Sequence, residues 1–282
     1  MFSYKNAKGE EISFDDYPYL MQENDLTDYS WNYETVDGKN KIKNIRHDVG
    51  ERNFTVAIVP DFNLPLKDRR YLVKEYLNRL FALFEYDTNN NVNGQIQADT
   101  GFYYPCRVIQ SDKVLYEEGL SIAKVKFTVV SEENIWIKPV TKTFIGSRAN
   151  ADQTNQDYPF DYLYDYAAGI NGVSVWNLNS YSCSHAKIVI YGAVLNPSIH
   201  INGHQYIVYT SVAADERLMI DTRYNTVYKV NSTGTMVNCF DLRGKQDSVF
   251  QKLPSSPLTV SWNGAFRFDI TAFVERSLPE WS

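Results

Sequence analysis

The sequence predicts an α+β domain, in which one helix packs on an antiparallel sheet, followed by an all-β domain of the sandwich type. The chain has 282 residues, and since an ordinary domain has about 100–200 residues, two domains are expected. One segment has the apolar spacing of a helix, whereas most others alternate with the period of a strand. Aromatic residues make up 15% of the chain, a content typical of sheets and interfaces.

The charge balance argues against nucleic acid as the main ligand. With 28 Lys and Arg against 34 Asp and Glu, the net charge is −6, and phosphate contacts need clustered cations. The basic pair Arg69–Arg70 lies in a helical pattern, so we interpret it as part of a solvated helix face.

The three cysteines, Cys106, Cys183 and Cys239, are interpreted as free, packed thiols. Their odd number and long spacings fit neither a disulfide framework nor a zinc ribbon. We therefore expect a protein made in a reducing cytoplasm. The first residues lack a basic flank followed by an apolar core, so no secretory signal is expected. No apolar run reaches the roughly 18 residues of a membrane span, so no membrane partner is expected.

The chain opens with two predicted short strands, at 2–4 and 11–14. The segment 17–44 that follows is polar, aromatic and rich in turn formers. Within it, Asp37–Gly38 is a tight-turn signal. This signal predicts a hairpin between 34–36 and 41–45.

A strand and a helix come next. Residues 52–59 alternate and place Phe54, Val56 and Ile58 on one face of a strand. The helix is predicted from Asp68, its expected N-cap, to about Phe84. Its apolar positions fall at helical spacing: Leu72, Val73, Tyr76, Leu77, Leu80, Phe81 and Phe84. The helix is expected to end before the loop-like sequence that starts at Asp87.

Period-two patterns then complete the first domain, predicted as residues 1–145. Because an amphipathic helix is stable only when its apolar stripe is covered, we expect this helix to lie on the sheet. The expected strands after the helix are 95–98, 103–104, 106–109, 120–130 and 135–138.

A linker or crossing segment is predicted at 146–166, and a β-sandwich at 167–282. The linker begins with a polar stretch, 146–156, and continues into the ring-rich 158–166. From residue 173 short strands and turns follow one another evenly, as in a sandwich. The clearest strands are 187–191, 198–201, 204–209, 216–220, 225–230, 258–262 and 265–270.

The sequence predicts no metal site, although His200 and His204 have the spacing of a zinc-binding helix. Asn202–Gly203 between them demands a two-residue hairpin turn. Such a turn pairs Ile201 with His204 and His200 with Gln205, so the two imidazoles point to opposite faces of the hairpin. This geometry rules them out as joint ligands of one zinc ion.

No catalytic or cofactor-binding residue is predicted either. There is no Gly-x-Ser-x-Gly elbow, no phosphate-binding glycine loop and no reactive cysteine signature. The stretch from Asp152 fails the calcium-loop pattern, because Asp157 replaces the required glycine and Leu163 the required glutamate. Acidic residues are many, and most are interpreted as surface or turn residues. We interpret the aromatic residues as part of a sheet core or a protein interface in preference to a sugar-stacking platform.

The order of segments resembles the distal tail protein (Dit) family of long-tailed bacteriophages. The first half is similar to the belt domain of that family, and the second half to its galectin-like sandwich. The segments that carry the resemblance in the first half are Asn53–Val59, Asp68–Phe84, Gly101–Arg107, Glu117–Phe127 and Ile135–Ile137. In the second half they are Gly192–Ile201, Asp215–Thr222, Thr226–Val230, Val249–Pro254 and Phe268–Trp281.

The resemblance implies a structural, non-enzymatic protein of the virion tail tip, made in the cytoplasm of the host bacterium. Belt domains of this kind assemble into a ring, commonly a hexamer, around the channel through which DNA passes, and the sandwich docks other tail proteins. The implied partners are further copies of the chain, the tail tube protein, a tail-associated protein and a receptor-binding protein.

Two other functions remain open from the sequence. The first is a carbohydrate-binding β-sandwich protein, because many functions share this architecture. The second is a glycoside hydrolase, which needs two carboxylates across a cleft.

Overall fold

The computed structural model describes residues 2–36, 38–117, 121–146 and 172–280. The chain forms two compact units. The first unit contains Met1–Lys138 and Arg276–Ser282, and the second contains Pro139–Glu275. The sequence placed the domains at 1–145 and 167–282; of the linker predicted at 146–166, only Gly146 lies within the described residues.

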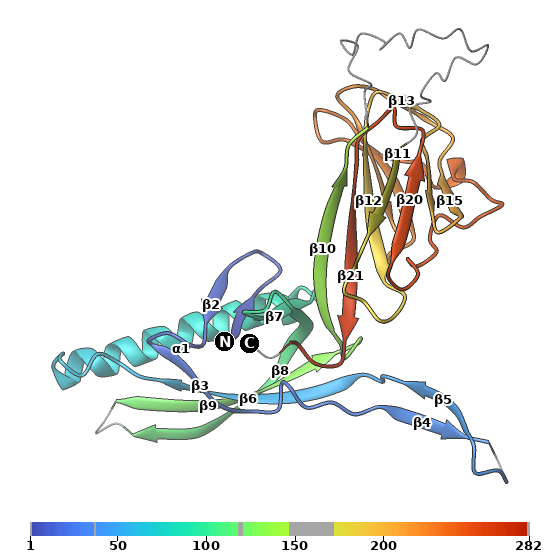
Figure 1. Cartoon of the computed structure of the whole chain (residues 1–282). Coiled ribbons are helices and arrows are strands. Elements are labelled where there is room, and N and C mark those ends of the chain that lie inside the picture. Colours follow the sequence, from blue (N-terminus) through green and yellow to red (C-terminus); the bar gives the residue numbers. More distant parts are fainter. Residues whose placement is uncertain (1, 37, 118–120, 147–171, 281–282) are drawn as a thin grey trace, which may run out of the picture. The chain divides into compact units, whose positions relative to one another are not determined.

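The first unit is an antiparallel sheet with one α-helix on it (Figure 1). The strands follow the order β3-β6-β9-β8-β7-β1-β2, and β10 joins β8 through the pair Ile137–Tyr103. The elements are β1 (Phe2–Lys5), β2 (Glu11–Ser13), β3 (Tyr19–Asn24), β4 (Asn32–Thr35), β5 (Ile42–Arg46), β6 (Gly50–Ile58), α1 (Leu66–Asn89), β7 (Gly94–Ala98), β8 (Tyr103–Glu117), β9 (Ile122–Ser131) and β10 (Trp136–Phe144).

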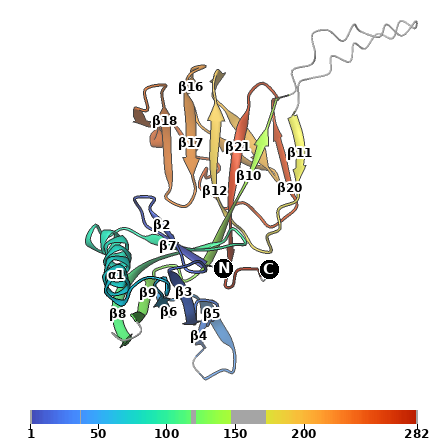
Figure 2. The ribbon, with the colours of Figure 1, turned by 90° about the vertical axis from the view of Figure 1, so that its left-hand side faces the viewer.

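The helix covers the sheet through a cluster of rings. Phe54, Val56 and Ile58 of β6 are all buried, which confirms the predicted face of this strand. The Phe127 ring of β9 lies 5.4 Å from that of Phe54 and 4.9 Å from that of Phe84 on the helix. Figure 2 looks along the helix and shows it lying against the strands. This aromatic contact explains why the amphipathic segment is helical, since its apolar stripe is covered.

Both predicted ends of the helix were wrong. Pro65 occupies the N-cap and makes no side-chain capping bond, and Asp68 lies in the first turn. The fixed φ of proline suits the entry to a helix, so no polar cap is needed. At the other end, the helix continues past Asp87 to Asn89. Asp87 is a buried residue that binds another part of the sheet, not a loop residue.

The early strands follow the prediction with two differences. Tyr19–Asn24, for which the sequence predicts no strand, is strand β3 and pairs with β6. The two short strands expected at 103–104 and 106–109 are one strand, β8, which accommodates irregularities in its pairing with β9. The predicted hairpin around Gly38 is confirmed, because β4 pairs with β5.

The second unit consists of two main sheets around one apolar core. One sheet has the order β19-β18-β17-β12-β21-β10, and the other β11-β20-β14-β15. The elements are β11 (Gly172–Trp176), β12 (His185–Tyr191), β13 (Val194–Leu195), β14 (Ser198–Ile201), β15 (His204–Ile207), β16 (Ser211–Val212), β17 (Arg217–Asp221), β18 (Thr226–Val230), β19 (Met236–Asn238), the 3₁₀ turn η1 (Phe240–Leu242), β20 (Leu258–Trp262) and β21 (Phe268–Arg276).

Residues of both sheets pack in the core of this unit. Phe144 stacks on Phe268 with ring centres 4.8 Å apart, and Trp262 meets Phe268 edge-on at 5.1 Å. Isoleucines of β12, β14 and β17 belong to the same buried cluster. The described part of the chain is therefore largely β, with one α-helix, as the α+β prediction requires. No helix in this part is long and apolar enough to cross a membrane.

Candidate assembly surface

The hairpin β4–β5 lies outside the core of the first unit. In Figure 1 it extends beyond the sheet from the end of β6. None of its residues belongs to the buried clusters, and nearly all are exposed. A two-stranded hairpin on its own is at best marginally stable in water. Within the unit, the hairpin is held only at its base among the described residues.

One face of this hairpin is apolar. Tyr33 pairs with Ile45, and Thr35 pairs with Ile42. Because paired residues share a face and alternate residues repeat it, these four side chains lie on the same side. Tyr33, Ile42 and Ile45 are 66%, 60% and 53% exposed. We call Tyr33, Thr35, Ile42 and Ile45 the apolar hairpin face.

The opposite face is polar and internally paired. The guanidinium of Arg46 forms ion pairs with Glu34 at 3.0 Å and with Asp48 at 2.9 Å. The side-chain amide of Asn32 donates a hydrogen bond of 2.8 Å to Asp48. The hairpin is thus amphipathic. Its polar face is well hydrated, whereas exposure of its apolar face to water is unfavourable.

The base of the hairpin is held by aromatic and buried polar contacts. The rings of Trp31 and His47 lie 3.8 Å apart. Burial, and secondarily the charge of Arg52, lowers the pKa of His47. Arg52 is buried over the Tyr104 ring at 4.5 Å, and donates hydrogen bonds to the carbonyl of Leu26 and, at 3.1 Å, to the side chain of Asn134. These contacts anchor the start of β6, and hence the hairpin, to the sheet.

Burial of the apolar hairpin face in a contact would be strongly favourable. Full burial of a large apolar side chain stabilises a contact by about 1.5–3 kcal/mol. Three such side chains stand together here, with Tyr29, Trp31 and Val49 exposed near the base. Exposed apolar side chains grouped on one face in this way are a candidate interaction site.

A second apolar surface lies at the start of the helix. A cavity of about 400 Å³ is lined by Tyr17, Val59, Pro60, Asp61, Phe62 and Asn63. The rings of Tyr17 and Phe62 are 51% and 53% exposed. We call these six residues the helix-start groove.

The structure places the predicted histidine pair as expected. Ile201 pairs with His204 and His200 with Gln205, which confirms the predicted register. Asn202 and Gly203 both have positive φ, as the two-residue turn requires. The Nε2 atom of His204 lies 2.8 Å from the carbonyl oxygen of Ser248, whereas His200 lies in a groove on the outer side of the sheet.

The three cysteines are free, as predicted, and the predicted packing is confirmed for two of them but was wrong for the third. Cys106 and Cys239 are buried, and burial raises the pKa of Cys106 to about 12. Cys183 is exposed, because it lies in the turn before β12 and not in a strand. Among the described residues, no three His, Cys, Asp or Glu side chains gather as metal ligands. The predicted aromatic segment 158–166 and the stretch from Asp152 lie outside the described residues.

The sequence predicts the hairpin but not its exposed apolar face. The signal was present, since Tyr33 and Thr35 alternate with polar residues and Ile42 and Ile45 stand across the turn. The sequence pattern does not show whether other elements of the fold cover this face.

Structures of phage hub and baseplate proteins match the chain over nearly its whole length. One is the Dit protein of phage SPP1, described as a paradigm of the hub adsorption apparatus in phages that infect Gram-positive bacteria. It has 12% identity and a TM-score of 0.60, with 98% of this chain and 99% of that chain covered.

Two more are structures of the phage P2 baseplate in its activated conformation. The structure with calcium has 11% identity, a TM-score of 0.57 and coverage of 98% of both chains. The structure with strontium has 11% identity, a TM-score of 0.53 and coverage of 99% of both chains. No protein-family model and no curated protein matches the sequence. The chain therefore has the fold of phage hub and baseplate proteins, as the resemblance to the Dit family implied.

Proposed function

We propose that the protein is a structural subunit of a phage tail tip that forms a ring joining the tail tube to the host-facing end of the tail. The observation that carries this proposal is the apolar hairpin face, which no described residue of its own unit covers. The likeness in fold to hub and baseplate proteins supports the same role. In this account the protein acts by assembly, and no catalytic step is assigned to it.

The ring would be built by the first unit, the belt-like domain of the resemblance, and a hexamer is the copy number that the Dit family suggests. The second unit, as a galectin-like sandwich, would dock further tail proteins. Its partners would be the tail tube protein, a tail-associated protein and a receptor-binding protein. DNA would only pass through the channel, which suits a chain of net charge −6.

Electron microscopy of the purified full chain tests this proposal. The expected result is closed particles with rotational symmetry around a central opening. Copies of the chain that never associate, at any concentration and also with tail tube protein added, would refute it.

A second candidate function, carbohydrate binding, is favoured by one observation. A groove of about 400 Å³ lies on the outer side of the sheet β11-β20-β14-β15. It is lined by Val173, Asn196, Ser198, His200, Ser261, Trp262 and Asn263, and thus by no Asp, Glu, Lys or Arg. Hydrogen-bonding groups beside apolar side chains are typical of a site for a neutral polar ligand.

A glycan array with the wild-type chain and the His200→Ala variant tests this candidate. Binding that His200→Ala weakens at least tenfold would support a saccharide site in the groove. The His185→Ala variant, altered in β12 of the other sheet, is the control. Absence of binding to every glycan would leave assembly as the only function proposed here.

A further inference from the structure

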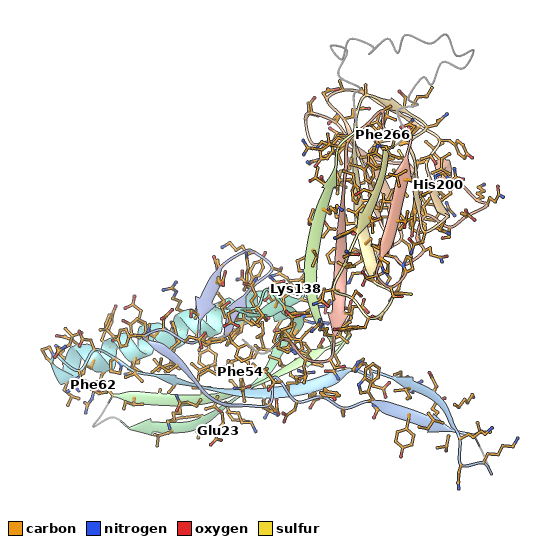
Figure 3. All side chains as sticks on the ribbon, in the orientation of Figure 1. Glu23, Phe54, Phe62, Lys138, His200 and Phe266 are labelled. Carbon is orange, nitrogen blue, oxygen red and sulfur yellow. The ribbon has the colours of Figure 1, made fainter. Side chains whose placement is uncertain are left out.

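Two uncovered apolar surfaces lie at opposite ends of strand β6. The hairpin β4–β5 precedes its first residue, Gly50, and the helix-start groove contains Val59 and Pro60, which follow its last residue, Ile58. The first and last residues of this nine-residue strand lie about 26 Å apart at a rise of roughly 3.3 Å per residue. In Figure 3 the labelled Phe62 lies at the end of the first unit that is remote from the hairpin. The hairpin therefore cannot reach the groove of its own chain.

We propose that the apolar hairpin face of one copy binds the helix-start groove of the next copy. This inference rests on the proposed function, and it names the two surfaces that would meet. The groove offers two half-exposed rings, Tyr17 and Phe62. The hairpin offers one ring and two isoleucines. Neither surface is covered within the described part of the chain.

Charge complementarity favours the hairpin of a second copy as the partner of the helix-start groove. Lys39, Lys41 and Lys43 of the hairpin are exposed and form no ion pair among the described residues. One exposed acid, Asp61, lines the groove. Docking would bring these opposite charges together, which speeds encounter and selects the correct register.

The cation beside the groove does not oppose this arrangement. The guanidinium of Arg69 lies over the Phe62 ring, 5.7 Å from its centre. It is partly buried, and it supports this ring from the helix. The charged residue that lines the groove is the acid Asp61. In the proposed contact, the three lysines would therefore meet a negative charge.

The geometry of such a contact has a definite consequence. Each copy gives its hairpin to one neighbour and its groove to the other, so the interface is heterologous. Heterologous contacts produce a ring when the rotation closes. Each surface is expected to be necessary for assembly, and neither is sufficient alone.

A mixing experiment tests the inference. The hairpin variant carries Tyr33→Glu and Ile45→Glu, and the groove variant carries Phe62→Glu. All three positions are exposed and lie outside the buried clusters, so both variants should fold. Asn44→Glu on the polar hairpin face and Tyr224→Glu, an exposed ring of the second unit, are the matched controls.

Light scattering should show each variant alone at the monomer mass of 32.5 kDa and both controls at the wild-type mass. An equimolar mixture of the two variants should give a dimer of twice that mass and nothing larger. The intact hairpin of one variant binds the intact groove of the other, and the remaining surfaces are blocked.

Two other results would each overturn the inference. If the wild-type chain assembles and the groove variant assembles equally well, the ring stands but the hairpin binds elsewhere. If both variants are monomeric and their mixture stays monomeric, the two surfaces do not meet. A wild-type chain that is always monomeric would instead refute the proposed function itself.

A cross-linking measurement gives an independent check without charge substitutions. Ile45→Cys and Phe62→Cys are made in separate chains that also carry Cys183→Ser, which removes the exposed native thiol. A short thiol-reactive cross-linker should join the two chains when they are mixed, and should join neither chain to its own copies. Equal joining of Asn44→Cys with Phe62→Cys would contradict the assigned face.

Discussion

The hydroxyl of Tyr4 donates a hydrogen bond of 2.7 Å to the carboxylate of Asp87, across 83 positions of the chain. The same carboxylate accepts a bond of 2.8 Å from the backbone N–H of Ala7. Both Tyr4 and Asp87 are fully buried. Burial, together with the nearby Cys106 and Asp87, raises the pKa of Tyr4 far above its ordinary value, so the hydroxyl keeps the proton that it donates. This contact ties strand β1 to the last turns of α1 in the first unit.

Asp87→Ala is therefore expected to lower the free energy of unfolding of the first unit by about 1–3 kcal/mol, because the buried hydroxyl of Tyr4 loses its acceptor. Urea denaturation followed by circular dichroism measures the change. Asp68→Ala, in the exposed first turn of the same helix, is the control and should cost less than about 0.5 kcal/mol. Similar losses for both variants would contradict the role of the buried carboxylate.

Gly94→Ala is expected to destabilise the same site. An added Cβ at Gly94 would collide with the carboxylate of Asp87 and with the hydroxyl of Tyr4. The expected loss is about 1–3 kcal/mol, as for overpacking of a buried site. Gly9→Ala changes a glycine whose Cβ would meet open space, although its positive φ adds its own strain. The double variant of Gly94→Ala with Tyr4→Phe, which removes the colliding hydroxyl, should lose less stability than the sum of the two single variants, and an additive loss would argue against the collision.

The thiols should differ sharply in reactivity. Cys183 is exposed, whereas Cys106 and Cys239 are buried, and the pKa of Cys106 is raised to about 12 by burial. A colorimetric thiol reagent at pH 8 should therefore label one thiol rapidly in the native chain and all three after denaturation. Rapid labelling of two thiols in the native chain would show that one of the two cores is open.

The base of the hairpin should weaken in acid. Burial and the charge of Arg52 lower the pKa of His47 in the folded chain, so the unfolded chain takes up a proton first as the pH falls. The stability that neutral His47 provides is complete above its unfolded pKa of about 6.5, and is lost as the pH falls from there through the lowered folded pKa.

Proton NMR of the His47 ring measures this directly. Its titration midpoint should lie below the unfolded value and should rise in the Arg52→Met variant, which removes the nearby charge. A midpoint above the ordinary histidine value would contradict the burial of the ring against Trp31.

Local patterns in the sequence were enough for much of the fold. The alternation of Phe54, Val56 and Ile58 and the turn at Asn202–Gly203 depend on neighbouring residues alone, and both predictions are confirmed. The helix ends depended on distant contacts. The sequence that starts at Asp87 has the composition of a loop. Only the buried hydrogen bond from Tyr4 explains why Asp87 lies inside the helix.

The candidate site could be predicted only in part, for the same reason. The sequence predicts the hairpin around Gly38, since turn chemistry is local. Whether Tyr33 and Ile45 meet a core or solvent depends on which other elements pack there. That information is spread over the whole first unit, so the exposed face emerged only from the structure.

The central claim is that the chain associates with copies of itself, and its mass in solution tests this most directly. Multi-angle light scattering of the wild-type chain over a range of concentrations should approach a single multiple of 32.5 kDa. The hairpin variant Tyr33→Glu with Ile45→Glu should stay at the monomer mass throughout. A wild-type mass of one chain at every concentration would contradict the account.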